Sequence, residues 1–208
     1  MPAHAARILG FFPTSSKSHN LIHNAIADAL ARAGHNVTVI GIMKNVYPKA
    51  PYKFIQIDPT EVAQTSQLSM KNMVSKPKHF YLSLFTMPQS ISAIDNQTLN
   101  HPKMLEFLRN NGVGAFDLVI LGYSLNDYAM GLGAHFRCPI VSSFQIQPTF
   151  VNHRLVGNPA EQSYVPMLFS NLKQPLTFMD RVVNYLANFL EQWILLPIFE
   201  REWLKVYK

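Results

Sequence analysis

The chain has 208 residues, enough to bury the core of one domain or of one domain with an appendage. Apolar residues make up 48% of it and charged residues only 14%, so we expect part of its surface to cover, or be covered by, something apolar. The net charge is +6, but the basic residues are scattered and cluster only at Lys71, Lys76 and Lys78, which argues against nucleic acid as a partner.

The amino-terminal part predicts a strand, a loop, a helix and a second strand. Residues 7–12 form a short apolar run that suits a buried parallel strand, and a polar loop follows it. From Asn20 the apolar residues recur at helical spacing, with Ser18 as the expected N-cap and Gly34 as the stop. Residues 36–42 then return to strand composition, and so short a crossover makes the two strands parallel neighbours. The helix face expected to be apolar consists of Ile22, Ala25, Ile26, Ala29, Leu30 and Ala33.

One histidine, His19, lies where this helix begins, at the carboxyl end of the first strand. Open parallel sheets bind ligands at that edge. The partial positive charge of a helix N-terminus disfavours the imidazolium, so a neutral ring could accept a proton from a hydroxyl. The alternative is that His19 only caps the helix or packs in the loop. His35, at the opposite edge of the sheet, is interpreted as structural.

The pair Ser18-His19 at the start of the helix is followed by the run AGHNVTV at residues 33–39. These residues resemble the amino-terminal half of a UDP-glycosyltransferase of the animal, and particularly the insect, type. The resemblance implies a GT-B architecture, in which two Rossmann-like halves face each other and bind the acceptor and the nucleotide sugar, respectively. It also implies that His19 is the general base that deprotonates the acceptor.

The region from residue 53 to residue 110 predicts one short strand and then helices. The strand covers residues 53–57, and the helices cover roughly residues 61–74, 78–95 and 102–110. The middle helix carries Phe80 and Phe85, which either pack on the sheet or line an apolar acceptor pocket. Together with Phe12 and Ser18, they are the residues that we expect to bind the acceptor.

The next part of the chain repeats the order strand, helix, strand. The strand at residues 116–121 is followed by a helix at 126–136 and a further strand at 140–144. Strands that alternate with helices in this way predict an α/β fold with a Rossmann-like, doubly wound and mostly parallel sheet.

Asp127 is the candidate partner of the base. The resemblance implies that an aspartate after the strand at 116–121 orients the imidazole of His19 and stabilises the imidazolium. In this chain the position directly after the strand is Gly122, and Asp127 comes five residues later. Asp127 either takes that role in a remodelled loop or is a first-turn carboxylate that the helix dipole favours.

Residues 177–208 predict a long helical stretch beyond a domain at residues 1–176. Pro197 is expected to interrupt it. Its tryptophans, Trp193 and Trp203, would suit a membrane interface, but the acidic residues among its charges favour packing on the domain or on a missing carboxyl-terminal half. The apolar stripe of this stretch consists of Phe178, Val182, Leu186, Phe189, Leu190, Trp193 and Leu196.

Two signals are missing from the sequence. The chain has no glycine-rich phosphate loop and nothing like the carboxyl-half signature that grips uridine diphosphate in the resembled family. A single cysteine, Cys138, gives no metal-binding pattern. We therefore expect no cofactor and no metal, and a UDP-sugar co-substrate bound mainly by an absent carboxyl-terminal half.

These observations lead to one hypothesis and one alternative. The chain is the acceptor half of an enzyme that transfers a sugar from a UDP-sugar to a small lipophilic hydroxyl compound with inversion, and it is inactive alone. The resemblance implies the lumen of the endoplasmic reticulum and membrane association for the full-length protein, although no signal peptide or anchor stands in this sequence. Contact with a membrane surface or homo-oligomerisation could occur. The alternative is a non-catalytic binding or regulatory protein for lipophilic ligands.

Overall fold

The computed structural model describes residues 5–58, 94, 96–123, 126–145, 147, 150–158, 161–167, 170 and 172–206. The chain divides into two compact units, Met1–Gln145 with Val206–Lys208, and Ile146–Lys205. The domain boundary predicted between residues 176 and 177 falls inside the second unit and stays a prediction. The helix predicted at 61–74, and that at 78–95 up to residue 93, lie outside the described residues.

A five-stranded sheet forms the first unit, and every strand pair in it is parallel. The order of the strands is β3-β2-β1-β4-β5. Their bounds are Arg7–Phe12 for β1, Asn36–Gly41 for β2, Lys53–Gln56 for β3, Leu118–Gly122 for β4 and Ile140–Ser143 for β5. This sheet confirms the predicted α/β, Rossmann-like fold, and each strand lies within two residues of its predicted bounds.

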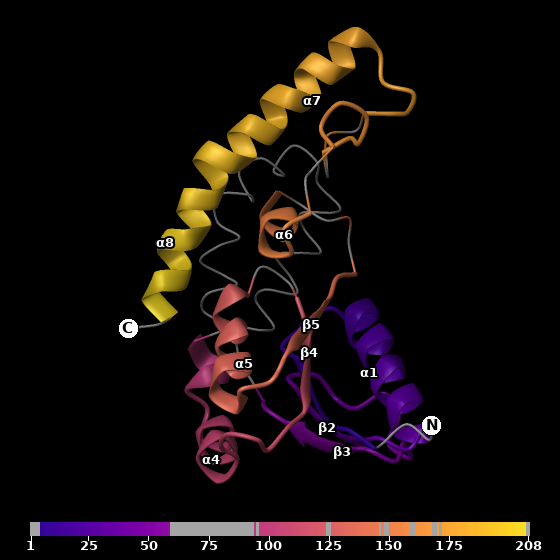
Figure 1. Ribbon diagram of the computed structural model, residues 1–208, viewed down its shortest axis with the longest axis vertical. Coiled ribbons are helices and arrows are strands. Elements are labelled where there is room, and N and C mark those ends of the chain that lie inside the picture. Colours follow the sequence, from indigo (N-terminus) through magenta and orange to yellow (C-terminus); the bar gives the residue numbers. More distant parts are fainter. Residues whose placement is uncertain are drawn as a thin grey trace. The chain divides into compact units, whose positions relative to one another are not determined.

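Helices cover both faces of the sheet (Figure 1). Helix α1 (Lys17–Arg32) follows β1 and packs on one face, whereas α4 (Pro102–Asn110) and α5 (Gly131–Phe136) pack on the other. The predicted helix at 126–136 is a 3-10 turn, η2 (Asp127–Met130), followed by α5. The connections after β1 and β4 therefore leave the sheet on opposite faces, which makes the carboxyl ends of these neighbouring strands the topological switch point.

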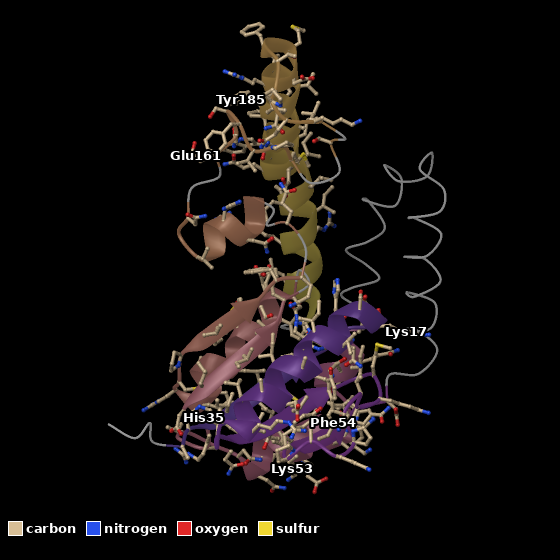
Figure 2. The ribbon with its side chains drawn as sticks, turned by 90° about the vertical axis from the view of Figure 1, so that its right-hand side faces the viewer. Lys17, His35, Lys53, Phe54, Glu161 and Tyr185 are labelled. Atoms are coloured by element: carbon tan, nitrogen blue, oxygen red, sulfur yellow. The ribbon has the colours of Figure 1, made fainter. Side chains whose placement is uncertain are left out.

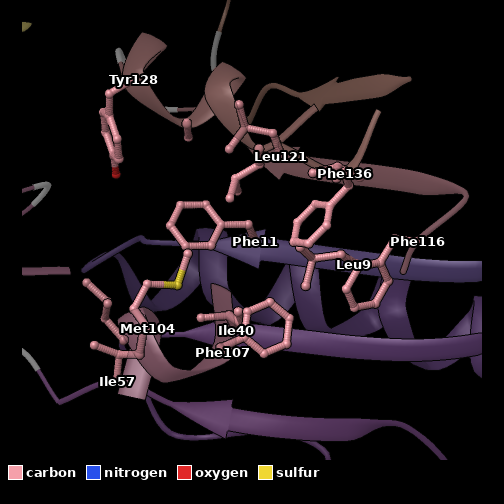
Figure 3. Packing of buried hydrophobic residues seen from close by; sticks show 14 of the residues in the cluster. Leu9, Phe11, Ile40, Ile57, Met104, Phe107, Phe116, Leu121, Tyr128 and Phe136 are labelled. Atoms are coloured by element: carbon pink, nitrogen blue, oxygen red, sulfur yellow. The ribbon is translucent and has the colours of Figure 1, made fainter. Parts of the chain in front are cut away.

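The larger apolar core lies between the sheet and helices α4 and α5 (Figure 3). Helix α4 has the predicted bounds, because Pro102 fits the first turn, where no N–H is needed, and the His101 ring accepts the Lys103 N–H at 3.2 Å. Its apolar side chains reach the core at the spacing of one helix face. Buried members of this core include Leu9, Phe11, Ile40, Ile57, Met104, Phe107, Phe116, Leu121 and Phe136.

Helix α1 differs from its prediction in the face that it buries. Ile22, predicted to be buried, is 44% exposed, and its neighbour Leu21 is 47% exposed. The buried face consists of Asn20, His23, Asn24, Ala27 and Ala31. Of the predicted face, Ile26 and Leu30 do pack against the core, but Ile22 does not. Hydrophobicity alone assigned the face, whereas alanines let the helix approach the strands closely and the asparagine amides find hydrogen-bond partners.

The start of α1 also differs from the prediction. The N-cap is Ser16 rather than Ser18, since Ser16 has an extended backbone and its carbonyl accepts the first helical hydrogen bond from Asn20 N at 2.9 Å. The helix then ends at Arg32, and Gly34 adopts a φ of +95°, as a glycine stop requires. Figure 2 labels Lys17 at the start of this helix and His35 just beyond its end. His35 accepts a hydrogen bond from Ala6 N at 3.1 Å, which confirms its structural interpretation.

Four helical segments lie in the described part of the second unit. They are α6 (Phe150–Leu155), α7 (Phe178–Leu190), the π-helical η3 (Glu191–Leu195) and α8 (Leu196–Val206). Helix α7 starts at a capping box, in which Thr177 and Asp180 bond each other's backbone N–H groups. The α-helical pattern is interrupted just before Pro197, where the helix widens into η3 and then continues as α8, because proline cannot donate to the carbonyl four residues earlier.

Helix α7 points polar residues inward. Asn184 is fully buried and Asn188 is 6% exposed, while Phe178, Tyr185 and Trp193 are each more than half exposed. Figure 2 shows Tyr185 on this helix. Leu196 is the buried member of the predicted apolar stripe. Among the described residues no helix has the length and apolar character needed to cross a membrane.

Candidate functional site

The candidate site lies at the carboxyl ends of β1 and β4. The two strands pair so that Phe11 stands opposite Leu121, which places Phe12 beside Gly122 at this edge. The loop after β1 leads into the first turn of α1, where His19 is the third helical residue. The segment after β4 leads into η2, which begins with Asp127. The fold thus directs both predicted catalytic residues to one edge of the sheet.

His19 is partly buried, and burial lowers the pKa of its imidazole below the usual value of 6.5. The sequence predicted this direction from the helix N-terminus, but the cause found is desolvation. A ring with a lowered pKa is neutral near pH 7, so it has a free electron pair with which to accept a proton.

Asp127 is held by a neighbour four residues earlier. Its carboxylate accepts a hydrogen bond from the hydroxyl of Tyr123. The Tyr123 side chain is itself buried, and its ring packs on Phe144 with a centroid distance of 5.0 Å. The carboxylate is thereby fixed next to the carboxyl end of β4. Its role as the group that orients His19 stays a prediction.

The four predicted acceptor-binding residues differ in their surroundings. Phe12 is 1% exposed and belongs to the core on the α1 face. Ser18 is exposed, and its Oγ lies 3.0 Å from Oγ of Ser16. Phe80 and Phe85 lie outside the described residues. Contact of these four side chains with an acceptor stays a prediction.

Sequence reasoning missed His23, which lies one helical turn after His19. Its ring is fully buried and stacks on Phe12, with a centroid distance of 4.5 Å and an interplanar angle of 7°. Burial, and then the charge of His19, lower the pKa of His23 to about 4. The spacing of four residues from His19 was the available signal, but the apolar-face assignment placed His23 outside the core.

The described residues contain no group of three or more His, Cys, Asp or Glu side chains that could hold a metal ion. The imidazole of His19 and the carboxylate of Asp127 can take part in proton transfer. A neutral imidazole is the commonest general base for a hydroxyl nucleophile.

Comparison with known proteins identifies the family. The family described as UDP-glucoronosyl and UDP-glucosyl transferase matches residues 8–208, so the chain belongs to this family. UDP-glycosyltransferase UGT5 of Dactylopius coccus is 27% identical over 190 residues, and UDP-glucuronosyltransferase 1A6 of Oryctolagus cuniculus is 28% identical over 195 residues. Each alignment covers 88% of this chain but 35% of the relative. The chain thus spans about a third of the length of these relatives.

Among solved structures, the glycosyltransferase VinC in complex with dTDP is 20% identical to this chain, with a TM-score of 0.42. The similarity covers 74% of this chain and 40% of VinC.

Proposed function

We propose that this chain is the acceptor-binding half of a UDP-glycosyltransferase that moves a sugar from a UDP-sugar to a small lipophilic hydroxyl compound. Membership of the family supports a UDP-sugar as the donor. The five-stranded sheet would be the first half of a GT-B architecture, and a carboxyl-terminal half would bind the UDP-sugar. The chain alone would then be inactive.

The observation that carries this proposal is the placement of His19. The imidazole lies in the first turn of α1, at the carboxyl end of β1 and beside the switch point of the sheet. Burial lowers its pKa, so the ring is neutral near pH 7 and ready to accept a proton. Asp127, next to the carboxyl end of β4, is the proposed supporting carboxylate.

In the proposed reaction His19 takes the proton of the acceptor hydroxyl as its oxygen attacks the anomeric carbon. The bond from that carbon to UDP breaks in the same step, and UDP leaves with the electron pair. A single displacement of this kind inverts the configuration at the anomeric carbon. Phe12, Ser18, Phe80 and Phe85 are the proposed contacts of the acceptor.

The test is transfer by this chain joined to the carboxyl-terminal half of a relative, with a UDP-sugar and a panel of phenols and lipophilic alcohols. The substitution His19→Gln should lower kcat about 10²- to 10⁴-fold, the usual contribution of a general base. His35→Gln is the matched control, because His35 lies at the other end of α1 and bonds the backbone of Ala6. Full transfer by the His19→Gln variant would remove His19 from the base role.

A second candidate is a non-catalytic binding or regulatory function, because apolar side chains are exposed on α7. Phe178 and Tyr185 on this helix, and Trp193 on η3, are exposed, as expected of a surface that packs on another protein, on a second copy or on a membrane surface. A non-catalytic protein that binds lipophilic ligands or regulates a full-length partner would show ligand binding by calorimetry and no transfer in the joined protein. For the full-length enzyme we propose the lumen of the endoplasmic reticulum, in association with the membrane.

A further inference from the structure

Two flat rings lie on the α1 face of the sheet at the carboxyl ends of β1 and β4. A Cβ atom on Gly10 would come within 2.7 Å of the Phe12 ring, and one on Gly122 would lie 2.6 to 3.0 Å from three atoms of the His23 ring. Real Cβ contacts are not this short, so both positions require glycine while the rings stay in place. Phe12 supports His23 from the other side by parallel stacking. The His23 ring is therefore wedged between α1 and the end of β4.

The nitrogens of this wedged ring have no hydrogen-bond partner among the described residues, although the ring is fully buried. The Ser143 backbone and the Gln145 side chain at the end of β5 lie within longer hydrogen-bonding reach of the imidazole and oppose the lowering of its pKa. A buried polar group without a partner destabilises the folded state. Such a group is retained where it has a task that packing does not supply.

His19 is the neighbour with which a free nitrogen of His23 can form a hydrogen bond. The two histidines are four residues apart on α1, so their side chains project from the same side of the helix. They are close enough for a charge on His19 to lower the pKa of His23. Because two adjacent imidazolium ions repel, the pair holds one proton at a time, and His19 keeps it since it is less buried.

We propose that His23, whose ring lies over Gly122, is the positioning residue for His19 and orients its imidazole, while the charge of Asp127 supports the imidazolium. This inference rests on the proposed function of His19. While His19 carries the proton of the acceptor, its second N–H donates to the free nitrogen of the neutral His23 ring. No proton passes to His23, which holds the His19 ring in one orientation.

Two substitutions separate this role from simple packing. His23→Phe keeps a flat ring on Phe12 and removes both nitrogens, whereas His23→Gln keeps a hydrogen-bond acceptor and removes the ring. In the joined protein, His23→Phe should lower kcat about tenfold with little change in KM, and His23→Gln should recover part of that loss. The opposite order, with His23→Phe active and His23→Gln impaired, would show a packing role and overturn the proposal.

A second readout does not depend on sugar transfer. Carbon-13 labelling of the histidines allows the pKa of His19 to be measured by NMR in the chain as it stands. That pKa should fall in His23→Phe, because the protonated ring loses its acceptor, and should stay near the wild-type value in His23→Gln. An unchanged pKa of His19 in His23→Phe would overturn the proposal. Absence of transfer in the wild-type joined protein would instead count against the proposed function alone.

The wedge over Gly122 is tested by a double-mutant cycle. Gly122→Ala should lower the thermal midpoint of the first unit by about 5 °C, since the new methyl group meets a ring that Phe12 holds in place. In a His23→Ala background, Gly122→Ala should lower the thermal midpoint by less than half of that amount. Gly131→Ala is the control, because its Cβ would meet nothing within 4 Å. Equal losses in both backgrounds would contradict the assigned position of His23.

Discussion

Helices α1 and α7 both bury polar side chains and leave apolar ones exposed, but they differ in how the buried groups are bonded. On α7 the Asn184 side chain accepts from Met167 N at 2.6 Å and donates to two backbone carbonyls, of Gln162 and Val165, at 2.7 and 2.8 Å. On α1 the His23 ring is as deeply buried as Asn184, yet neither of its nitrogens is bonded among the described residues.

This difference separates a structural polar group from a candidate functional one. Every polar atom of the Asn184 side chain joins α7 to the segment at residues 162–167, so the buried amide stabilises the second unit. The imidazole of His23 contributes no such bond to the first unit. Burial of a polar residue is thus no sign of function by itself, and the unmet hydrogen-bonding capacity is what points to a task.

The largest loss of stability is expected from a substitution of Asn184. The substitution Asn184→Leu leaves one backbone N–H and two carbonyls without their partner and should lower the free energy of unfolding by about 3 kcal/mol. Both tryptophans of the chain lie in the second unit, so urea unfolding followed by tryptophan fluorescence measures it. Asn188→Leu is the control, since Asn188 donates to the carbonyl of Asn184 within the same helix, and it should cost less than half as much. Equal costs would mean that the bonds to residues 162–167 contribute little.

The second effect is a dependence of stability on pH that His23 creates. Its pKa is about 4 in the folded chain and about 6.5 in the unfolded one, so only the unfolded chain takes up this proton as the pH falls below 6.5. Stability should therefore decrease toward acid, by about 2 kcal/mol between pH 7 and pH 5.

The variant His23→Phe should lose that part of the pH dependence and be slightly more stable than wild type at pH 7. Urea unfolding at both pH values, followed by circular dichroism, gives the two differences. Asp117 does not titrate in this window, because Arg7 holds its pKa at about 2. An identical acid loss in wild type and variant would contradict the buried, neutral state of His23.

Much of the fold could be predicted because it depends on local patterns. The five strands and α4 follow from short apolar runs, proline and glycine signals and helical spacing, and the structure has them within two residues. The buried faces of α1 and α7 could not be predicted in this way. Hydropathy placed Ile22 inside and left Asn184 unnoticed, whereas burial at both sites depends on partners far away along the chain.

The residues of the candidate site also differ in whether a local pattern predicts them. His19 could be found because its place at the start of a helix after a strand is a local feature of the sequence. His23 could not, because its burial depends on a stack with Phe12 and on the missing side chain of Gly122, which come together only in the folded sheet. In the sequence, Gly122 stands out only as the absence of a carboxylate; in the structure it is the last residue of β4, and the His23 ring lies over it.

The smallest loss of stability is expected at Tyr52, which forms a hydrogen bond with the buried Asn24 side chain of α1. The Tyr52 hydroxyl donates toward Oδ1 of Asn24 at 2.8 Å and of Asn45 at 2.6 Å, and burial is the main cause that raises the pKa of Tyr52 to about 12. Tyr52→Phe keeps the ring and removes the hydroxyl, so it should lower the free energy of unfolding by about 1 kcal/mol. The measurement is urea unfolding followed by circular dichroism, with Tyr47→Phe as the control. By contrast, His23→Phe is expected to raise the free energy of unfolding. Changes of opposite sign in these two variants would show that the two buried side chains differ in their hydrogen bonds and not in their burial. A gain of stability in Tyr52→Phe would remove that distinction.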